Sequence, residues 1–169
     1  MIVYHGTSYY RWEKIKTEGL LRVTTKKTVV YDIDTQTGTV PGFAYLTDSV
    51  PVALNFAIRT WSKEHPIHKE ECPKLVVLKL EMPDGLQKDP DVRGFDKSLL
   101  EEMNATDYVF DEDIPIKRAC KEIAYFLFRT SDEADTCVDG LVGRILKKEK
   151  IKWKKIDEYR DFNGYYDLL

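Results

Sequence analysis

Apolar residues recur along this chain with two different periods, and the alternation between them predicts strands and helices in turn. A β-branched and aromatic run at residues 2–4 predicts a first strand, which a turn connects to a helix over 10–18. Gly19 ends that helix, because glycine readily adopts the left-handed conformation found at helix ends. Residues 42–47 predict a further strand, and the run Leu-Val-Val-Leu-Lys-Leu at 75–80 predicts the strand at the centre of the sheet.

The helical period is sharpest in the segment that follows residue 47. From Val50, apolar side chains recur at intervals of 3, 4, 7, 8 and 11 residues, at Ala53, Leu54, Ala57, Ile58 and Trp61. These positions form one stripe, so this side of the helix is expected to pack on the core. Phe56 lies off the stripe, and its ring must therefore be exposed, packed against a loop or directed at a ligand.

The other segments predict shorter or mixed elements. In chain order they are a polar loop over 24–39 with a strand at 28–31, a helix over 97–103, a strand over 107–110, helix or mixed structure over 116–128, and partly helical structure over 139–169.

Length and composition favour a single domain over residues 1–169. A chain of 169 residues with 43% hydrophobic content can bury one core but is short for two. No stretch approaches the roughly 18 apolar residues of a membrane span, and the first residues begin a strand rather than a signal sequence. We therefore expect a cytoplasmic protein without membrane attachment.

Cysteine and histidine spacings give little indication of a metal site. His65, His68 and Cys72 cannot complete a tetrahedral set from one helical face, and Pro66 interrupts the segment. We therefore predict no metal. The cysteines are widely spaced and include no Cys-x-x-Cys pair, which favours free buried thiols at Cys72, Cys120 and Cys137.

The net charge of −3 gives no reason to expect nonspecific attraction to nucleic acid. A basic segment over 144–155 is the exception: it carries seven Lys or Arg residues against Glu149, with Trp153 among them. This segment could contact phosphates, but a solvated helix or an edge strand is the explanation that we favour.

Two motifs indicate chemistry. His5-Gly6 at the end of the first strand places an imidazole beside a backbone that a ligand can approach closely. Forty residues after His5, Tyr45 lies in the strand that leads into the apolar helix. No Gly-x-Gly-x-x-Gly or phosphate-loop pattern follows a strand, so dinucleotide redox chemistry and nucleoside triphosphate hydrolysis have no support.

The order of these motifs resembles the ADP-ribosyltransferase family of the diphtheria-toxin type, which has a histidine, tyrosine and carboxylate triad, over about residues 2–115. His5-Gly6-Thr7 is similar to the first family block, and Gly19-Leu20-Leu21-Arg22 to its Gly-Leu-Arg with one residue more. Gly42-Phe43-Ala44-Tyr45 is similar to the Gly-x-Tyr block with one inserted residue. Phe56 stands eleven residues after the tyrosine, where the family has an aromatic residue.

The third block of the family is a carboxylate before a β-branched and aromatic strand. Asp107, which precedes Tyr-Val-Phe, is the best counterpart, although the family usually has glutamate there. In the second block, Ala53 replaces a small hydroxyl residue that the family often has on the helix, shortly before the aromatic residue at position 56. Nearby carboxylates remain alternatives for this role: Glu101, Glu102, Asp111 and Glu112.

The resemblance implies an α+β domain with a split, mainly antiparallel β-sheet, flanking helices and a cleft for NAD between the halves of the sheet. The helical and basic part over 116–169 lies outside the match. The implied activity is mono-ADP-ribosyl transfer from NAD to a macromolecular acceptor with release of nicotinamide, or hydrolysis of NAD when no acceptor is bound. NAD is then a substrate that is consumed, and no metal is implied.

The implied catalytic residues are His5, Tyr45 and Asp107. A carboxylate stabilises the positive charge that develops on the ribose as its bond to nicotinamide breaks, and aromatic faces hold the nicotinamide ring. His5 would bond a ribose hydroxyl, and the backbone of Gly6 the carboxamide. The residues implied to bind NAD are His5, Gly6, Thr7, Arg22, Tyr45 and Phe56, with Thr7 and Arg22 on the adenosine and diphosphate side.

Two other functions fit the same fold. The first is a module that binds a nucleotide or RNA without catalysis, which the aspartate in place of glutamate favours. The second is an RNA 2′-phosphotransferase, but that family calls for a second histidine and an arginine in later motifs, and His65 and His68 are unsuitably placed. The acceptor, whether protein, nucleic acid or small molecule, and a role as toxin, phage effector or housekeeping enzyme, stay open.

Overall fold

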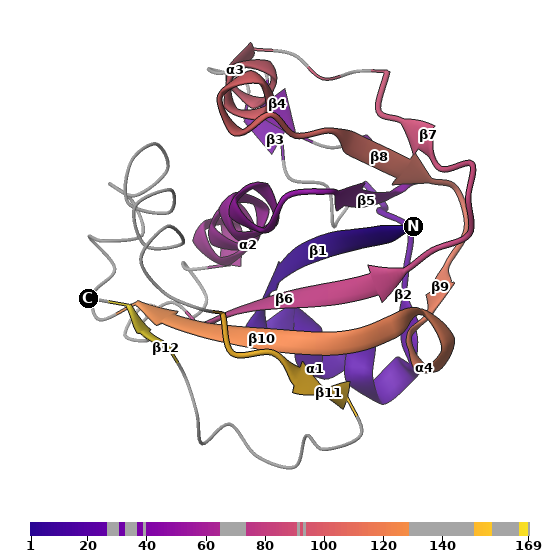
Figure 1. The fold of residues 1–169 in the computed structure, drawn as a ribbon, viewed down its shortest axis with the longest axis vertical. Helices are drawn as coiled ribbons and strands as arrows, with labels where there is room; N and C mark the ends of the chain where they lie inside the picture. The colour runs from indigo at the N-terminus through magenta and orange to yellow at the C-terminus, as the bar shows by residue number, and fades with distance from the viewer. Residues whose placement is uncertain are drawn as a thin grey trace.

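The structure is a computed structural model that describes residues 1–26, 31–32, 37–38, 40–64, 74–90, 92, 94–128, 151–156 and 166–168 (Figure 1). Its elements in chain order are β1 (Ile2–Ser8), α1 (Tyr9–Glu18), β2 (Leu20–Leu21), β3 (Tyr31–Asp32), β4 (Thr37–Gly38), β5 (Ala44–Thr47), α2 (Val50–Glu64), β6 (Lys74–Glu81), β7 (Gln87–Lys88), α3 (Gly94–Met103), β8 (Asp107–Phe110), β9 (Ile114–Pro115), α4 (Ile116–Ala119), β10 (Cys120–Phe128), β11 (Lys154–Lys155) and β12 (Tyr166–Leu168).

Among the described residues, the largest sheet has eight strands in the order β11-β10-β6-β1-β5-β8-β7, with β12 added beside β10. Its pairs are antiparallel except for the parallel pair of β10 and β12. The short strands β2 and β9 form a second ladder, and β3 and β4 a third. The fold is therefore α+β with a mostly antiparallel sheet, in agreement with this part of what the resemblance implies.

Strand β6 lies inside the sheet between β10 and β1. Its Leu75, Val76, Val77, Leu78 and Leu80 are fully buried, because both faces of the strand are covered. Leu78 and Leu80 pack in a cluster with Trp12 of α1, whereas Leu75 and Val77 pack in a cluster with α2. Alternate residues of a strand point to opposite faces, so α1 and α2 cover opposite faces of the sheet; Figure 1 shows α1 behind β10.

The apolar stripe predicted for α2 is confirmed. Ala53, Leu54, Ala57, Ile58 and Trp61 are buried and pack together against β6 and β10. The prediction that Gly19 ends the first helix is also confirmed, since its backbone has φ 70° and its N–H donates to the Ile15 carbonyl.

One predicted boundary is wrong, and one prediction that the sequence left open is now resolved. Strand β1 does not end in a turn at His5; it continues to Ser8, because it pairs with β6 from Ile2↔Glu81 to Ser8↔Leu75. Residues 116–128, for which the sequence left helix or mixed structure open, are mixed: α4 ends at Ala119, and Cys120–Phe128 is the long strand β10. Side chains of β10 are buried on both faces of the sheet, so its apolar positions lack the alternation that identifies a strand.

The C-terminal part is also less helical than predicted where the structure describes it. Residues 151–156 contain the edge strand β11, and 166–168 form β12. Residues 139–150 lie outside the described residues, as do 28–30 of the strand predicted at 28–31. Of the cysteines, Cys120 is a free, buried thiol, and burial raises its pKa to about 12; Cys72 and Cys137 lie outside the described residues.

No helix in the described ranges combines the length and apolar character needed to cross a membrane.

Candidate active site

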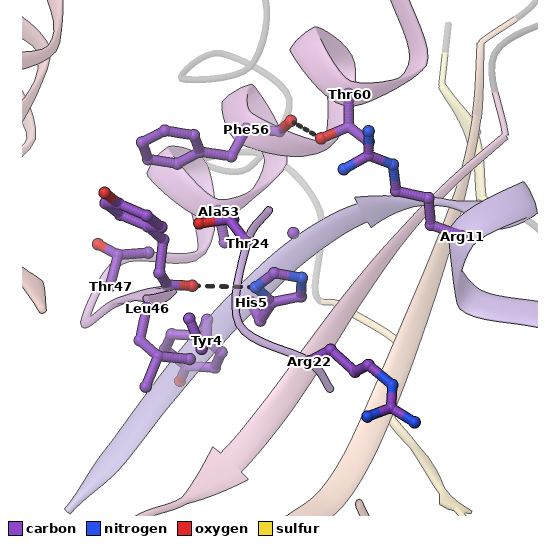
Figure 2. Close-up of a pocket in the computed structure, with 13 residues that line it drawn as sticks. Tyr4, His5, Arg11, Arg22, Thr24, Leu46, Thr47, Ala53, Phe56 and Thr60 are labelled. Carbon is purple, nitrogen blue, oxygen red and sulfur yellow. Dashed lines mark hydrogen bonds between the residues drawn. The ribbon is translucent and has the colours of Figure 1, made fainter. Parts of the chain in front are cut away.

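A pocket opens where two neighbouring strands of the sheet separate. Strands β1 and β5 share the register pair Tyr4↔Thr47, whereas β1 stays paired with β6 as far as Ser8. The edge of β1 that faces β5 is thus left without a strand partner from His5 onward. The residues that line the pocket are Tyr4, His5, Gly6, Arg11, Arg22, Thr24, Ala44, Tyr45, Leu46, Thr47, Ala53, Phe56 and Thr60 (Figure 2).

Most of the site residues predicted from the sequence meet in this pocket. His5 and Gly6 come from β1, Arg22 follows β2, Tyr45 lies on β5 and Phe56 on α2. The structure does not bring Thr7 or Asp107 to the lining; Thr7 is 2% exposed in the core and Asp107 is 5% exposed on β8.

The imidazole of His5 bridges the gap between the separated strands. Its Nδ1–H donates to the Tyr45 carbonyl oxygen at 2.9 Å, as the dashed line in Figure 2 marks. The pKa of His5 is lowered to about 4: burial is the main cause, the bond to the Tyr45 carbonyl opposes it, and the nearby charge of Arg11 adds a smaller lowering. A neutral ring that donates from Nδ1 accepts at Nε2. Figure 2 shows this second nitrogen turned away from Tyr45, toward the side where Arg11 and Arg22 lie.

The lowered pKa of His5 predicts a loss of stability in acid. Below its ordinary pKa of 6.5 the unfolded chain binds a proton at His5, whereas the folded chain does not until about pH 4. Stability from this group is therefore complete above pH 6.5 and is lost as the pH falls toward 4, by on the order of 2 kcal/mol for a partly solvated ring. Urea unfolding of the wild type and of His5→Gln between pH 7 and 4 measures this difference. Parallel profiles for the two proteins would contradict it.

Packing against α2, as well as access for a ligand, requires glycine at position 6. A Cβ at this position would lie 1.5 Å from the Ala53 carbonyl oxygen and 3.1 Å from the Ala57 nitrogen. The backbone of α2 thus occupies the space that any side chain at position 6 would need. This close approach brings Phe56 and Thr60 of the same helix to the pocket.

Two aromatic residues face the pocket from different elements. The hydroxyl of Tyr45 accepts from the Val40 N–H at 2.7 Å and lies 3.3 Å from the Val40 carbonyl oxygen, which holds the phenol ring in place. The Phe56 ring packs against the apolar cluster of Val52, Leu99 and Leu100. Figure 2 shows this ring directed away from the axis of α2, toward the side where Thr47 lies. The off-stripe position of Phe56 therefore corresponds to a ring that both packs and lines the pocket.

The lining is positively charged. It contains two arginines and no Asp or Glu among the described residues. Arg22 is held by two carboxylates, with Nε 2.7 Å from Glu18 and Nη1 3.0 Å from Asp113. Asp113 also accepts from the Val23 N–H at 2.9 Å, so this network fixes the chain after β2.

Sequence analysis missed the second arginine. Arg11 lies in the first turn of α1, where its N–H donates to the capping hydroxyl of Ser8 at 3.2 Å. Its side chain lines the same pocket as Thr60 of α2. The available signal is its distance along the chain: a residue in the first turn of the helix that directly follows β1 stays close to the end of that strand.

Asp107 occupies the next strand beyond the pocket wall. It pairs with Thr47, which pairs with Tyr4, so these three residues share one face of the sheet. Strands are spaced about 4.8 Å apart, which places the backbone of Asp107 roughly 10 Å from β1. The alternative carboxylates are exposed and do not line the pocket: Glu101, Glu102, Asp111 and Glu112.

Within the described ranges, no three His, Cys, Asp or Glu side chains gather in a way that could hold a metal ion. His65, His68 and Cys72 lie outside these ranges.

Comparison of the chain with protein-family models, with curated proteins and with solved structures finds no significant match. The chemistry of the pocket must therefore be inferred from its residues.

Proposed function

We propose that this protein is an NAD-dependent mono-ADP-ribosyltransferase, which transfers ADP-ribose from NAD to a macromolecular acceptor and releases nicotinamide. One observation carries the proposal: His5, Tyr45 and Phe56, which lie far apart in the sequence, line one pocket at the point where β1 and β5 separate. The proposal includes the finer fold assignment, an ADP-ribosyltransferase-like split sheet, and a cytoplasmic location.

The two aromatic residues suit the flat nicotinamide ring. Tyr45 is fixed through its hydroxyl, and Phe56 is fixed by its packing against α3. Rings that are already held in place lose little conformational freedom on binding, and each stack contributes about 0.5–1.5 kcal/mol beyond its area burial. The backbone of Gly6 is assigned to the carboxamide.

His5 is assigned to a ribose hydroxyl. Because its ring is neutral and donates to Tyr45 from Nδ1, Nε2 carries a lone pair that accepts from the hydroxyl. The same bond fixes the orientation of the ring. His5 would therefore hold the sugar in place without taking a proton from it.

The positive lining suits the diphosphate of NAD. Guanidinium groups bind phosphate oxygens through paired, charge-assisted hydrogen bonds. Arg22 is already engaged by Glu18 and Asp113, so it has to exchange or share these partners to contact a phosphate. We assign Arg11 to the diphosphate together with Arg22, and Thr7 to the structural core beneath them.

The reaction breaks the bond between ribose C1 and the ring nitrogen of nicotinamide. The electron pair of that bond stays on the nitrogen, so nicotinamide leaves as a neutral molecule. An acceptor nucleophile then forms the new bond to C1 and loses its proton; water in that role gives ADP-ribose. The Asp107 carboxylate is assigned to the positive charge that builds up on the sugar. The diphosphate stays with the ADP-ribose, whether it is joined to the acceptor or released after hydrolysis, and nicotinamide carries none of it.

Nicotinamide release provides the test of this function. We expect the wild type to release nicotinamide from NAD, and His5→Ala and Tyr45→Ala each to lower the rate by about tenfold or more, because each removes a contact to the bound substrate. Tyr10→Ala is the matched control, since Tyr10 is exposed and does not line the pocket. Chromatography of the reaction mixture measures the rate. Full activity in both pocket variants would reject the assigned site.

A second candidate is a module that binds a nucleotide without turning it over. It is favoured by the position of Asp107, one strand beyond a pocket whose described lining residues include no carboxylate. Calorimetry that detects NAD binding by a wild type that releases no nicotinamide would favour this function over the enzyme.

A further inference from the structure

The C-terminal segment 151–156 contacts the wall of the pocket across the sheet. Its strand β11 pairs with β10 through Glu122↔Lys155 and Ile123↔Lys154. Trp153, just before β11, stacks on Tyr4, with ring centroids 5.7 Å apart and an interplanar angle of 26°. Tyr4 lines the pocket next to His5. A residue near the end of the described chain therefore supports a side chain of the proposed NAD site.

The register of the sheet explains how this contact forms. Thr47, Tyr4, Lys79, Glu122 and Lys155 are successive partners across five strands, so they lie in one row on one face. Figure 1 shows the strands of this row side by side from β5 to β11. Neighbouring side chains in this row can contact one another, so contacts can extend from the pocket at β5 to the sheet edge at β11.

Lys79 of β6 also contacts the indole of Trp153. Its Nζ lies 5.6 Å from the centroid of the Trp153 ring and 2.6 Å from the Glu122 carboxylate, within a salt bridge. A cation over an indole face is attracted by the π system, and the carboxylate fixes that cation. Trp153 thus contacts a ring of β1 and a charge of β6.

The indole of Trp153 also packs against the same face of the sheet as α2. Tyr4, Val50, Ile151 and Trp153 pack against the cluster formed by α2, β6 and β10. Tyr4 therefore lies between the pocket and the indole. Removing the indole would leave the Tyr4 ring free to turn away from the lining.

We propose that Trp153 is a positioning residue of the pocket, whose stack on Tyr4 fixes the wall that a nicotinamide dinucleotide contacts. The segment 151–156 then sets affinity for this ligand although it contributes no residue to the lining. The inference rests on the proposed function and adds a residue that the motifs of the first 115 positions do not contain.

The test compares Trp153→Leu, Trp153→Phe and Ile156→Ala in nicotinamide release. We expect Trp153→Leu to raise KM for NAD about three- to tenfold, as expected for loss of one stacked ring, with kcat changed less than about twofold. Trp153→Phe keeps a ring on Tyr4 and should restore KM. Ile156→Ala is the matched control, because Ile156 belongs to the same segment but packs in the opposite cluster.

A double-mutant cycle separates positioning from general destabilisation. If Trp153 acts through Tyr4, Trp153→Leu raises KM when Tyr4 is present. The same substitution has no further effect on KM in a protein that already carries Tyr4→Leu. An unchanged KM in Trp153→Leu, or an equal rise in Ile156→Ala, overturns the inference while the proposed function stands. A wild type that neither binds NAD nor releases nicotinamide overturns the proposed function, and with it the ligand named here.

Discussion

Gly6→Ala is expected to disrupt the packing of α2 on β1 and to lower the free energy of unfolding by more than about 4 kcal/mol. The added Cβ would lie 1.5 Å from the Ala53 carbonyl oxygen, 2.4 Å from its carbon and 3.1 Å from the Ala57 nitrogen. All three are backbone atoms of a helix and cannot rotate away as a side chain could. Ordinary overpacking costs about 1–3 kcal/mol, but here the whole helix must move.

Gly19→Ala is the matched control for this prediction. It makes the same substitution at a glycine where a Cβ would meet nothing within 4 Å, although φ is +70°. Strain in the left-handed region alone costs about 1 kcal/mol. Urea unfolding of both variants measures the difference. Equal losses would show that the contact with Ala53 is not the cause.

The pattern of apolar residues predicts those elements that have one buried face or clear ends. The stripe of α2, the glycine that ends α1 and the strand β8 at 107–110 are all where the sequence places them. Strand β10 was missed because helices and strands on both sides bury it, so its sequence shows no alternation. The continuation of β1 beyond Tyr4 depends on pairing with β6, which local sequence does not reveal.

The same distinction between local and tertiary information applies to the residues of the candidate site. Residues in short motifs, such as His5, Tyr45 and Phe56, could be selected because their spacing along the chain is itself the signal. Arg11 could have been selected from its position in the helix that directly follows β1, but Trp153 could not, because only folding brings it to the wall of the pocket. For Gly6, the sequence predicts that something approaches its backbone closely. It does not reveal that the backbone of α2 is what does so, because that contact depends on tertiary packing.

Asp107→Asn is expected to lower nicotinamide release about 100-fold while NAD binding changes much less. The amide keeps the size of the side chain but removes the negative charge that would stabilise the sugar in the transition state. Glu112→Gln is the matched control, because Glu112 is exposed and outside the lining. Release rates and calorimetric Kd values for the three proteins provide the measurement. Equal losses in both variants would remove Asp107 from the catalytic assignment.

Asp107→Glu is the complementary variant, because it keeps the negative charge and lengthens the side chain. Asp107 is buried on β8, and Thr47 separates it from the pocket, so a side chain longer by one methylene should bring the carboxylate closer to the sugar. We therefore expect Asp107→Glu to release nicotinamide at least as fast as the wild type. If the chain is a binding module, neither Asp107→Asn nor Asp107→Glu alters a rate that is already at background, and both leave Kd nearly unchanged. The pair of variants thus separates a short but active carboxylate from a site that binds without reacting.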